Sequence, residues 1–212
     1  VFTVLGAAMG PAEGVKADYP LPEALAEVSV RITQGSKSMS AWPAFVSAAK
    51  IDAVMPSTAV DGDAQVTVTY RGRTSAPAAV RITSSNFGAF SNANGKGPGV
   101  IRNVNSADDQ PLNTRLATAK PGQFAVLSGT GLGPIDAPDN VAPPAVQLPA
   151  EVFVGGKPAK VAYAGRDTCC AGRDRIEFEV PPEAPVGCNI PVQVKAGSSY
   201  SNVVTMAIEA NG

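Results

Sequence analysis

The chain repeats itself, and this duplication constrains its fold more than any other feature of the sequence. FTVLGAAMGP (2–11) returns as FAVLSGTGLGP (124–134), an apolar run followed by a glycine-rich turn that closes on Gly-Pro. Further blocks return in the same order: LPEALAEVSVRI (21–32) as LPAEVFVGG (148–156), IDAVMPSTAVDGDAQVTV (51–68) as IEFEVPPEAPVGCNIPVQV (176–194), and SAPAAVRI (75–82) as SNVVTMAI (201–208). Matched blocks in one order indicate two copies of one structural unit.

Each copy has the pattern of a β-sheet unit. Apolar residues alternate with polar ones, as at Val66 and Val68, which is the period of a strand with one buried face. The 212 residues include 21 Gly and 19 Pro, which sandwiches use at their turns and helices tolerate poorly. The one helical candidate, PEALAEV (22–28), runs directly into a strand pattern and is expected to be a strand or a single turn. The sequence predicts an all-β chain of two tandem immunoglobulin-like β-sandwich domains.

The repeat also predicts the domain boundaries. The first domain is expected at 1–85 and the second at 99–212, with a Gly/Asn-rich junction at 86–98 between them. In the second domain, 100–105 and 114–118 are expected to form strands ahead of the FAVL block.

We expect the first domain to lack this opening strand, because a single residue precedes its FTVL block. The edge exposed by that loss would be formed by Val1, Phe2, Thr3, Val4 and Leu5, and an open edge leaves unpaired backbone groups. Three explanations stay open. The domain manages without the strand or is a trimmed fragment, a preceding domain supplies it, or another subunit donates it by β-augmentation.

Four stretches of the second copy carry a resemblance to a known family. They are PGQFAVLSGTGLGP, LPAEVFVGGKPAKVAYAG, DRIEFEVPPEAPVGCNIPVQV and YSNVVTMAI, together with FGAFSNANGKGPGVIRNVNS between the copies. These stretches resemble immunoglobulin-like modules of large secreted acidobacterial proteins, which are similar to the IPT/TIG group. The resemblance implies the fold and an extracellular location but no activity. The first copy departs from it, with GAAMGP in place of GTGLGP and no cysteine.

Composition excludes several classes of function. The chain has no histidine, which removes imidazole bases and Ser-His or Cys-His pairs, so we expect no enzyme. The net charge of −1, with no basic block, argues against nucleic acid, and no apolar run is long enough to enter a membrane. Acidic turns lack the spacing of a calcium loop, so no metal or other cofactor is expected. The chain begins with Val, and we expect a signal peptide to have been removed.

The three cysteines predict a cross-link in the second domain. Cys169 and Cys170 lie in GRDTCCAGRD, a stretch that the first copy lacks, and Cys188 follows the next strand. We expect a disulfide from Cys188 to Cys170, or alternatively to Cys169, which would contribute about 3 kcal/mol by restricting the unfolded chain. A vicinal Cys169–Cys170 bond and a thiolate metal site are the alternatives.

The same stretch is the candidate binding loop, because loops on a rigid sandwich commonly bind ligands. Its candidate residues are Arg166, Asp167, Arg173, Asp174 and Arg175. They could form a bidentate network that holds the loop, or a solvated loop with weak local ion pairs. Trp42, Phe45, Tyr163 and Phe178 are expected in the core.

These observations predict a non-enzymatic, extracellular or cell-surface structural or adhesive module. Its expected partners are other protein subunits, including copies of itself in a filament assembled by strand donation, or neighbouring domains. The alternative is a ligand- or carbohydrate-binding accessory module of a larger secreted protein.

Overall fold

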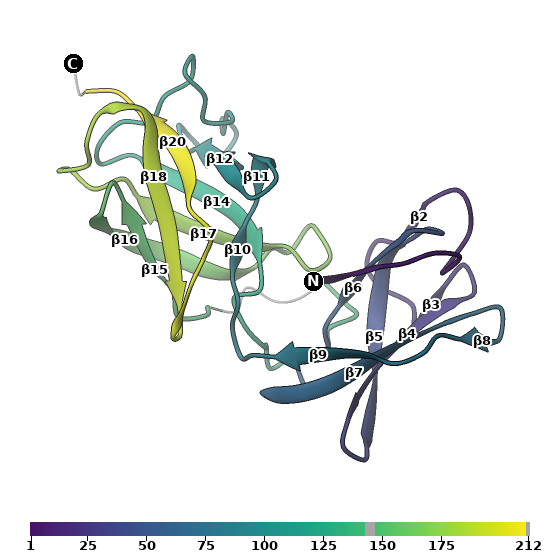
Figure 1. The fold of residues 1–212 in the computed structure, drawn as a ribbon. Coiled ribbons are helices and arrows are strands. Elements are labelled where there is room, and N and C mark those ends of the chain that lie inside the picture. The colour runs from purple at the N-terminus through teal and green to yellow at the C-terminus, as the bar shows by residue number, and fades with distance from the viewer. Residues whose placement is uncertain (143–146, 211–212) are drawn as a thin grey trace. The chain divides into compact units, whose positions relative to one another are not determined.

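The computed structural model describes residues 1–142 and 147–210, and these residues form strands and turns without a helix (Figure 1). The prediction of an all-β chain is confirmed. The chain divides into two compact units. Unit 1 consists of Val1–Ser84, Pro134–Ala145 and Asp167–Gly172, and unit 2 consists of Ser85–Gly133, Val146–Arg166 and Arg173–Gly212.

Unit 1 is built from β1 to β9. Their bounds are β1 (Phe2–Leu5), β2 (Val15–Lys16), β3 (Ala24–Leu25), β4 (Val28–Gln34), β5 (Lys37–Val46), β6 (Lys50–Val54), β7 (Gly62–Tyr70), β8 (Arg73–Thr74) and β9 (Ala78–Ile82). The strands pair in the order β1-β6-β5-β4-β7-β8, and β2, β3 and β9 pair with β5, β4 and β7. All of these pairings are antiparallel.

Unit 2 is built from β10 to β20. Their bounds are β10 (Gly88–Ala89), β11 (Ser91–Ala93), β12 (Lys96–Gly99), β13 (Ile101–Asn103), β14 (Phe124–Thr130), β15 (Glu151–Val154), β16 (Lys157–Arg166), β17 (Asp174–Glu179), β18 (Gly187–Ala196), β19 (Ser199–Tyr200) and β20 (Val204–Ile208). The path β14-β17-β16-β15-β18, with β19 and β20 on β18, repeats the path β1-β6-β5-β4-β7, with β8 and β9 on β7. The two units therefore share one strand order.

One long strand in each unit belongs to two ladders. The first half of β5, up to Ala41, pairs with β4, and the second half, from Trp42, pairs with β6. In unit 2, β16 changes partner from β15 to β17 between Ala159 and Lys160. A register shift follows the change in both strands. A bulge lets a strand bend, so that one strand can take part in two ladders.

The ladders also fix which residues of the two units are equivalent. Val4 pairs with Ile51, and Leu127 pairs with Ile176. Ile51 and Ile176 begin matching sequence blocks, so their partners Val4 and Leu127 are equivalent. An alignment of FTVL with FAVL by sequence would instead have matched Val4 with Val126, so the structural alignment is shifted by one residue. The backbone agrees with this offset, because Ala8 (φ 53°) corresponds to Gly131 (φ 95°), and both adopt the left-handed conformation.

Each unit buries its own apolar core. In unit 1 the core lies between the inward faces of β4, β5, β6 and β7, where Val28, Ile32 and Ile51 have no exposed area. The core of unit 2 contains more residues and includes the fully buried Phe178 and Ile101. At roughly 25 cal/mol per Å² of apolar surface removed from water, these cores are the main stabilising contribution to each unit.

The Gly/Asn-rich stretch 86–98, expected to be a junction, lies in unit 2 and forms β10, β11 and most of β12. It is ordered there because β10 pairs with β14 and β12 pairs with β20. Of the strands expected at 100–105 and 114–118, the first contains β13, whereas Thr114 and Ala117 close a short turn. PEALAEV contains β3 and a turn, as expected for a strand or single turn.

Candidate functional site

The outer edge of β1 is the first candidate site. Among the described strands, β1 pairs with β6 alone. Its inward residues Phe2 and Val4 are only half-buried, and Leu5 is 76% exposed. The corresponding strand of unit 2, β14, pairs with β17 on one side and with β13 and β10 on the other. With both edges covered, Ala125 and Leu127 have no exposed area.

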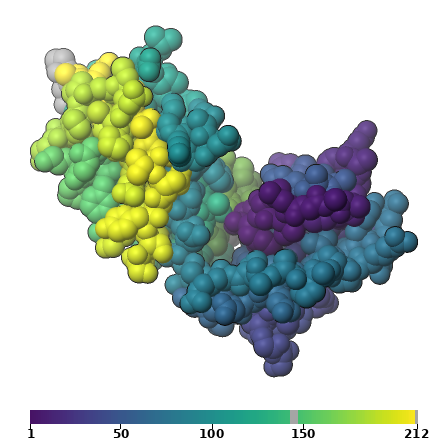
Figure 2. All heavy atoms as spheres, viewed as in Figure 1, coloured from purple at the N-terminus to yellow at the C-terminus, as the bar shows by residue number. Residues whose placement is uncertain are grey.

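The edge of β9 shows the same difference. Ala78 is exposed and Val80 is half-buried, and β9 pairs with β7 alone among the described strands. Their counterparts on β20 are Val204, which is fully buried, and Met206, which is 2% exposed. β20 is covered because β12 pairs with it. We call the two open edges, β1 and β9, the seam of unit 1; Figure 2 shows β1 in purple above β9 in blue.

Two of the candidate loop residues, Arg166 and Asp174, form a buried ion pair. The Arg166 guanidinium pairs with the Asp174 carboxylate, and these side chains are 12% and 0% exposed. Asp174 Oδ2 accepts a hydrogen bond of 2.8 Å from Leu132 N, and Arg166 Nη2 donates one of 2.7 Å to Gly133 O. The pair thus fixes the glycine-rich turn that follows β14. Charges satisfied in this way are not available to an external ligand.

The other three residues of the candidate loop have different surroundings. The Arg175 guanidinium lies over the Tyr163 ring, 4.7 Å from its centroid, in a cation–π contact. Tyr163 was expected in the core but is only half-buried. Arg173 is half-buried directly before β17. Asp167 Oδ1 accepts a hydrogen bond of 3.2 Å from Cys169 N. Of the five residues, the structure thus brings Arg166 and Asp174 together as an ion pair.

The disulfide in the structure differs from the one expected from the sequence. Cys169 is bonded to Cys170, and Cys188 is a free, exposed thiol. The two bonded cysteines are neighbours in sequence and belong to the Asp167–Gly172 segment of unit 1, and Cys188 is in β18 of unit 2. The segment packs beside the start of β1, since a Cβ added to Gly172 would lie 1.8 Å from Val1 Cγ2.

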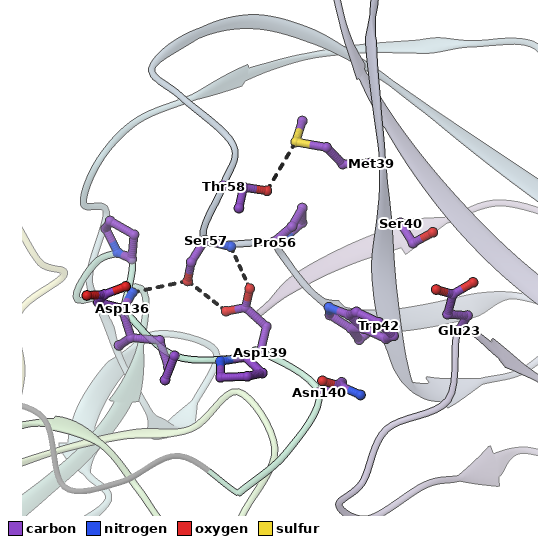
Figure 3. A pocket seen from close by; sticks show the side chains of 14 residues that line it. Glu23, Met39, Ser40, Trp42, Pro56, Ser57, Thr58, Asp136, Asp139 and Asn140 are labelled. Atoms are coloured by element: carbon purple, nitrogen blue, oxygen red, sulfur yellow. Dashed lines mark hydrogen bonds between the residues drawn. The ribbon is translucent and has the colours of Figure 1, made fainter.

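A pocket of about 930 Å³ in unit 1 is the second candidate site (Figure 3). The β5 residues Met39, Ser40 and Trp42 line one side of it. The other lining residues are Glu23, Pro56, Ser57, Thr58, and 134–140. Trp42 is half-buried and lines this pocket, so the prediction that it lies in the core is wrong. Phe45 was also predicted in the core, but it is half-buried and lies outside it.

Hydrogen bonds hold the 134–140 segment in place. Asp139 accepts one of 2.7 Å from Ser57 N and one of 2.6 Å from Ser57 Oγ, and Ser57 Oγ accepts one of 3.1 Å from Ile135 N. Leu21 N donates to Asn140 O at 2.6 Å. The rim of the pocket is therefore fixed before any ligand arrives. Sequence reasoning missed it because its residues come from four separate stretches of the chain.

The pocket combines an aromatic ring with acceptor groups. Glu23, Asp136 and Asp139 are its charged lining residues, and Asn140 adds an amide. An aromatic ring beside polar groups can bind the apolar face and the hydroxyls of a sugar, or a cation. No group of three or more His, Cys, Asp or Glu in the described part of the chain could hold a metal ion. No helix of the described residues is long and apolar enough to cross a membrane.

No family model matches this chain, and no curated protein matches it. Among the solved structures similar to it is the surface layer protein SbsC, domains 4–9, with 12% sequence identity and a TM-score of 0.29. That match covers 88% of this chain and 22% of the other chain. Similarity at this level determines neither a family nor a function.

Proposed function

We propose that this chain is an extracellular, non-enzymatic structural or adhesive module of two immunoglobulin-like β-sandwich repeats. It joins other subunits, as in a filament, by accepting a strand at the open edge of unit 1. One observation carries this proposal: both units have the same strand order, but β13 and β10 cover β14 whereas no described strand covers the outer edge of β1. An uncovered edge presents unpaired N–H and C=O groups to another chain.

The assignment to the immunoglobulin-like class is supported by the antiparallel ladders and the apolar core of each unit. The extracellular location is supported by the Cys169–Cys170 disulfide, since disulfides persist in oxidising compartments. The non-enzymatic role rests on the sequence, which contains no histidine for general base or nucleophilic chemistry.

The association state of the purified chain tests the proposal. Two open edges can pair with each other, so we expect concentration-dependent self-association in sedimentation velocity experiments. Leu5→Lys places a charge on the edge at a residue that is 76% exposed, and should abolish association without unfolding the chain. Leu116→Lys is the matched control, because Leu116 is 100% exposed and lies in unit 2. A chain that stays monomeric at every concentration contradicts self-assembly.

The pocket lined by Trp42 supports a second candidate function, a ligand- or carbohydrate-binding accessory module. Trp42, Ser40 and Asn140 would supply the ring, hydroxyl and amide that sugar recognition uses. Isothermal titration with oligosaccharides tests this, and Trp42→Ala should weaken binding by about tenfold or more, from the loss of about 1.4 kcal/mol. Phe90→Ala, at a 39% exposed phenylalanine of unit 2, is the control. If Trp42→Ala leaves oligosaccharide binding unchanged, the pocket is not the binding site.

A further inference from the structure

We propose that the pocket of unit 1 binds an oligosaccharide of amino sugars, with a primary ammonium on each ring, in preference to neutral or acidic sugars. This inference rests on the second proposed function, carbohydrate binding at Trp42, and names the chemical class of the ligand. It does not depend on the open strand edges, and every residue that lines the pocket belongs to unit 1.

The polar side chains of the pocket fall into two groups. Asp139 accepts its two hydrogen bonds from Ser57, and Thr58 Oγ1 donates one of 3.5 Å to Met39 Sδ. These bonds hold the wall of the pocket. Among the described residues, no hydrogen bond or ion pair engages the side chains of the other polar lining residues, which are Glu23, Ser40, Asp136 and Asn140. These side chains are the ones that a ligand can bind.

The charge of the pocket favours a cationic ligand. Its charged lining residues are Glu23, Asp136 and Asp139, and its described lining contains no lysine or arginine. The whole chain is nearly balanced, with 17 basic and 18 acidic residues, so the negative charge is a local property of the pocket. An acidic sugar would meet like charges there, whereas an ammonium can donate charge-assisted hydrogen bonds to the Glu23 and Asp136 carboxylates.

The two carboxylates that the fold leaves available are separated. Figure 3 shows Glu23 and Asp136 on opposite sides of the pocket, with Trp42 between them. One small cation cannot contact carboxylates on opposite sides of a pocket of about 930 Å³. A ligand that pairs with both therefore needs ammonium groups at two positions of an extended framework. Neighbouring rings of an amino-sugar chain supply them.

The neutral groups of the pocket favour a sugar framework over a cationic peptide. The Trp42 ring can pack against the apolar face of a sugar ring and attracts an ammonium placed over it. The Ser40 hydroxyl and the Asn140 amide, both on half-buried residues, can bond to ring hydroxyls, which a lysine side chain lacks. The volume of about 930 Å³ lies at the upper end of the range of small-molecule pockets, about 300–1,000 Å³, and so suits more than one ring.

Isothermal titration of the full chain with three tetramers of the same β-1,4 linkage tests this ligand class. The tetramers are built of glucosamine, glucose and glucuronic acid, and the first two differ only in the 2-ammonium that replaces the 2-hydroxyl. The titration is done at about pH 6, where such amines are protonated. We expect the glucosamine tetramer to bind about tenfold more tightly than the glucose tetramer, from two exposed charge contacts of up to about fivefold each. The glucuronic acid tetramer should bind more weakly than both.

Charge-removing variants locate the ammonium contacts. Glu23→Gln and Asp136→Asn should each weaken binding of the glucosamine tetramer about fivefold and leave binding of the glucose tetramer unchanged, because they remove a charge and keep the shape of the side chain. Glu183→Gln is the matched control, since Glu183 is an exposed glutamate of unit 2. An equal loss in the Glu183 variant would mean that the cationic tetramer binds by general attraction to the chain, and would overturn the inference.

The remaining outcomes separate this inference from the function on which it rests. Equal affinities for the glucosamine and glucose tetramers would overturn the preference for amines and leave carbohydrate binding at the pocket intact. A tetralysine peptide that binds as tightly as the glucosamine tetramer, with the same loss in Trp42→Ala, would show that the pocket recognises cations without a sugar framework and would also overturn it. If none of the tetramers binds, both the inference and the second proposed function are wrong.

Discussion

The ion pair between Arg166 and Asp174 allows the sharpest test of the energetics of unit 2. Asp174→Ala would leave the guanidinium of a side chain that is 12% exposed without its carboxylate. It would also remove the acceptor of Leu132 N. Breaking a buried ion pair from one side costs about 3–5 kcal/mol, and an unsatisfied buried N–H costs about 1–3 kcal/mol. Because the two losses share one side chain and are not additive, we expect unit 2 to lose about 4 kcal/mol of its free energy of unfolding.

Urea denaturation followed by far-UV circular dichroism measures this loss. The one tryptophan of the sequence, Trp42, lies in unit 1, so its fluorescence reports the unfolding of unit 1 separately. Asp63→Ala is the matched control, because it breaks the Asp63–Arg81 pair, whose side chains are 88% and 75% exposed. Exposed pairs contribute about 1 kcal/mol or less. If Asp174→Ala and Asp63→Ala cost the same, the argument from burial is wrong.

Other predictions concern the core, the thiols and the surface. In urea denaturation, Phe178→Ala should cost about 3–5 kcal/mol, because the side chain is fully buried, whereas Leu116→Ala should change stability by less than about 0.5 kcal/mol. Iodoacetamide applied without reductant should label Cys188 alone, and peptide mass mapping that finds Cys188 in a disulfide would contradict the structure. The hydrogen bond that Lys195 Nζ donates to Glu151 Oε1 raises the pKa of Lys195, so Glu151→Gln should lower this pKa in an NMR titration. The raised pKa stabilises the fold at pH values below the unfolded-state pKa, and this contribution is lost as the pH rises through the folded-state pKa.

Local periodicity made the strands and the duplication predictable from the sequence. The alternation at Val66 and Val68 places both in the core, and both are buried. The offset between FTVL and FAVL was missed, because the two tetrapeptides match better in the wrong register than in the one that the ladder uses. The shared Gly-Pro at 10–11 and 133–134 was the signal for the correct register. Register depends on which residues face the core across strands, and this information is not local.

The segment 86–98 has the composition of a linker, but it is a set of strands. Its glycines and asparagines give no alternating pattern, and its order comes from partners far along the chain, such as Asn202, which donates hydrogen bonds to Ala89 O and Gly95 O. The pocket was hidden for the same reason, since Glu23, Trp42 and Asp139 are distant in sequence. Arg166 and Asp174 were recognised as possible partners, but only their burial distinguishes a structural pair from a surface one.

The strand that serves two ladders has a consequence under mechanical load. In each unit one long strand, β5 or β16, pairs with one strand along its first half and with another strand along its second half, so a pulling force cannot slide one ladder past the other without breaking hydrogen bonds in both. Tension that reaches one ladder is transmitted covalently to the other. A tether built from such units would resist shear with rows of hydrogen bonds acting together, and would yield in discrete steps, one unit at a time.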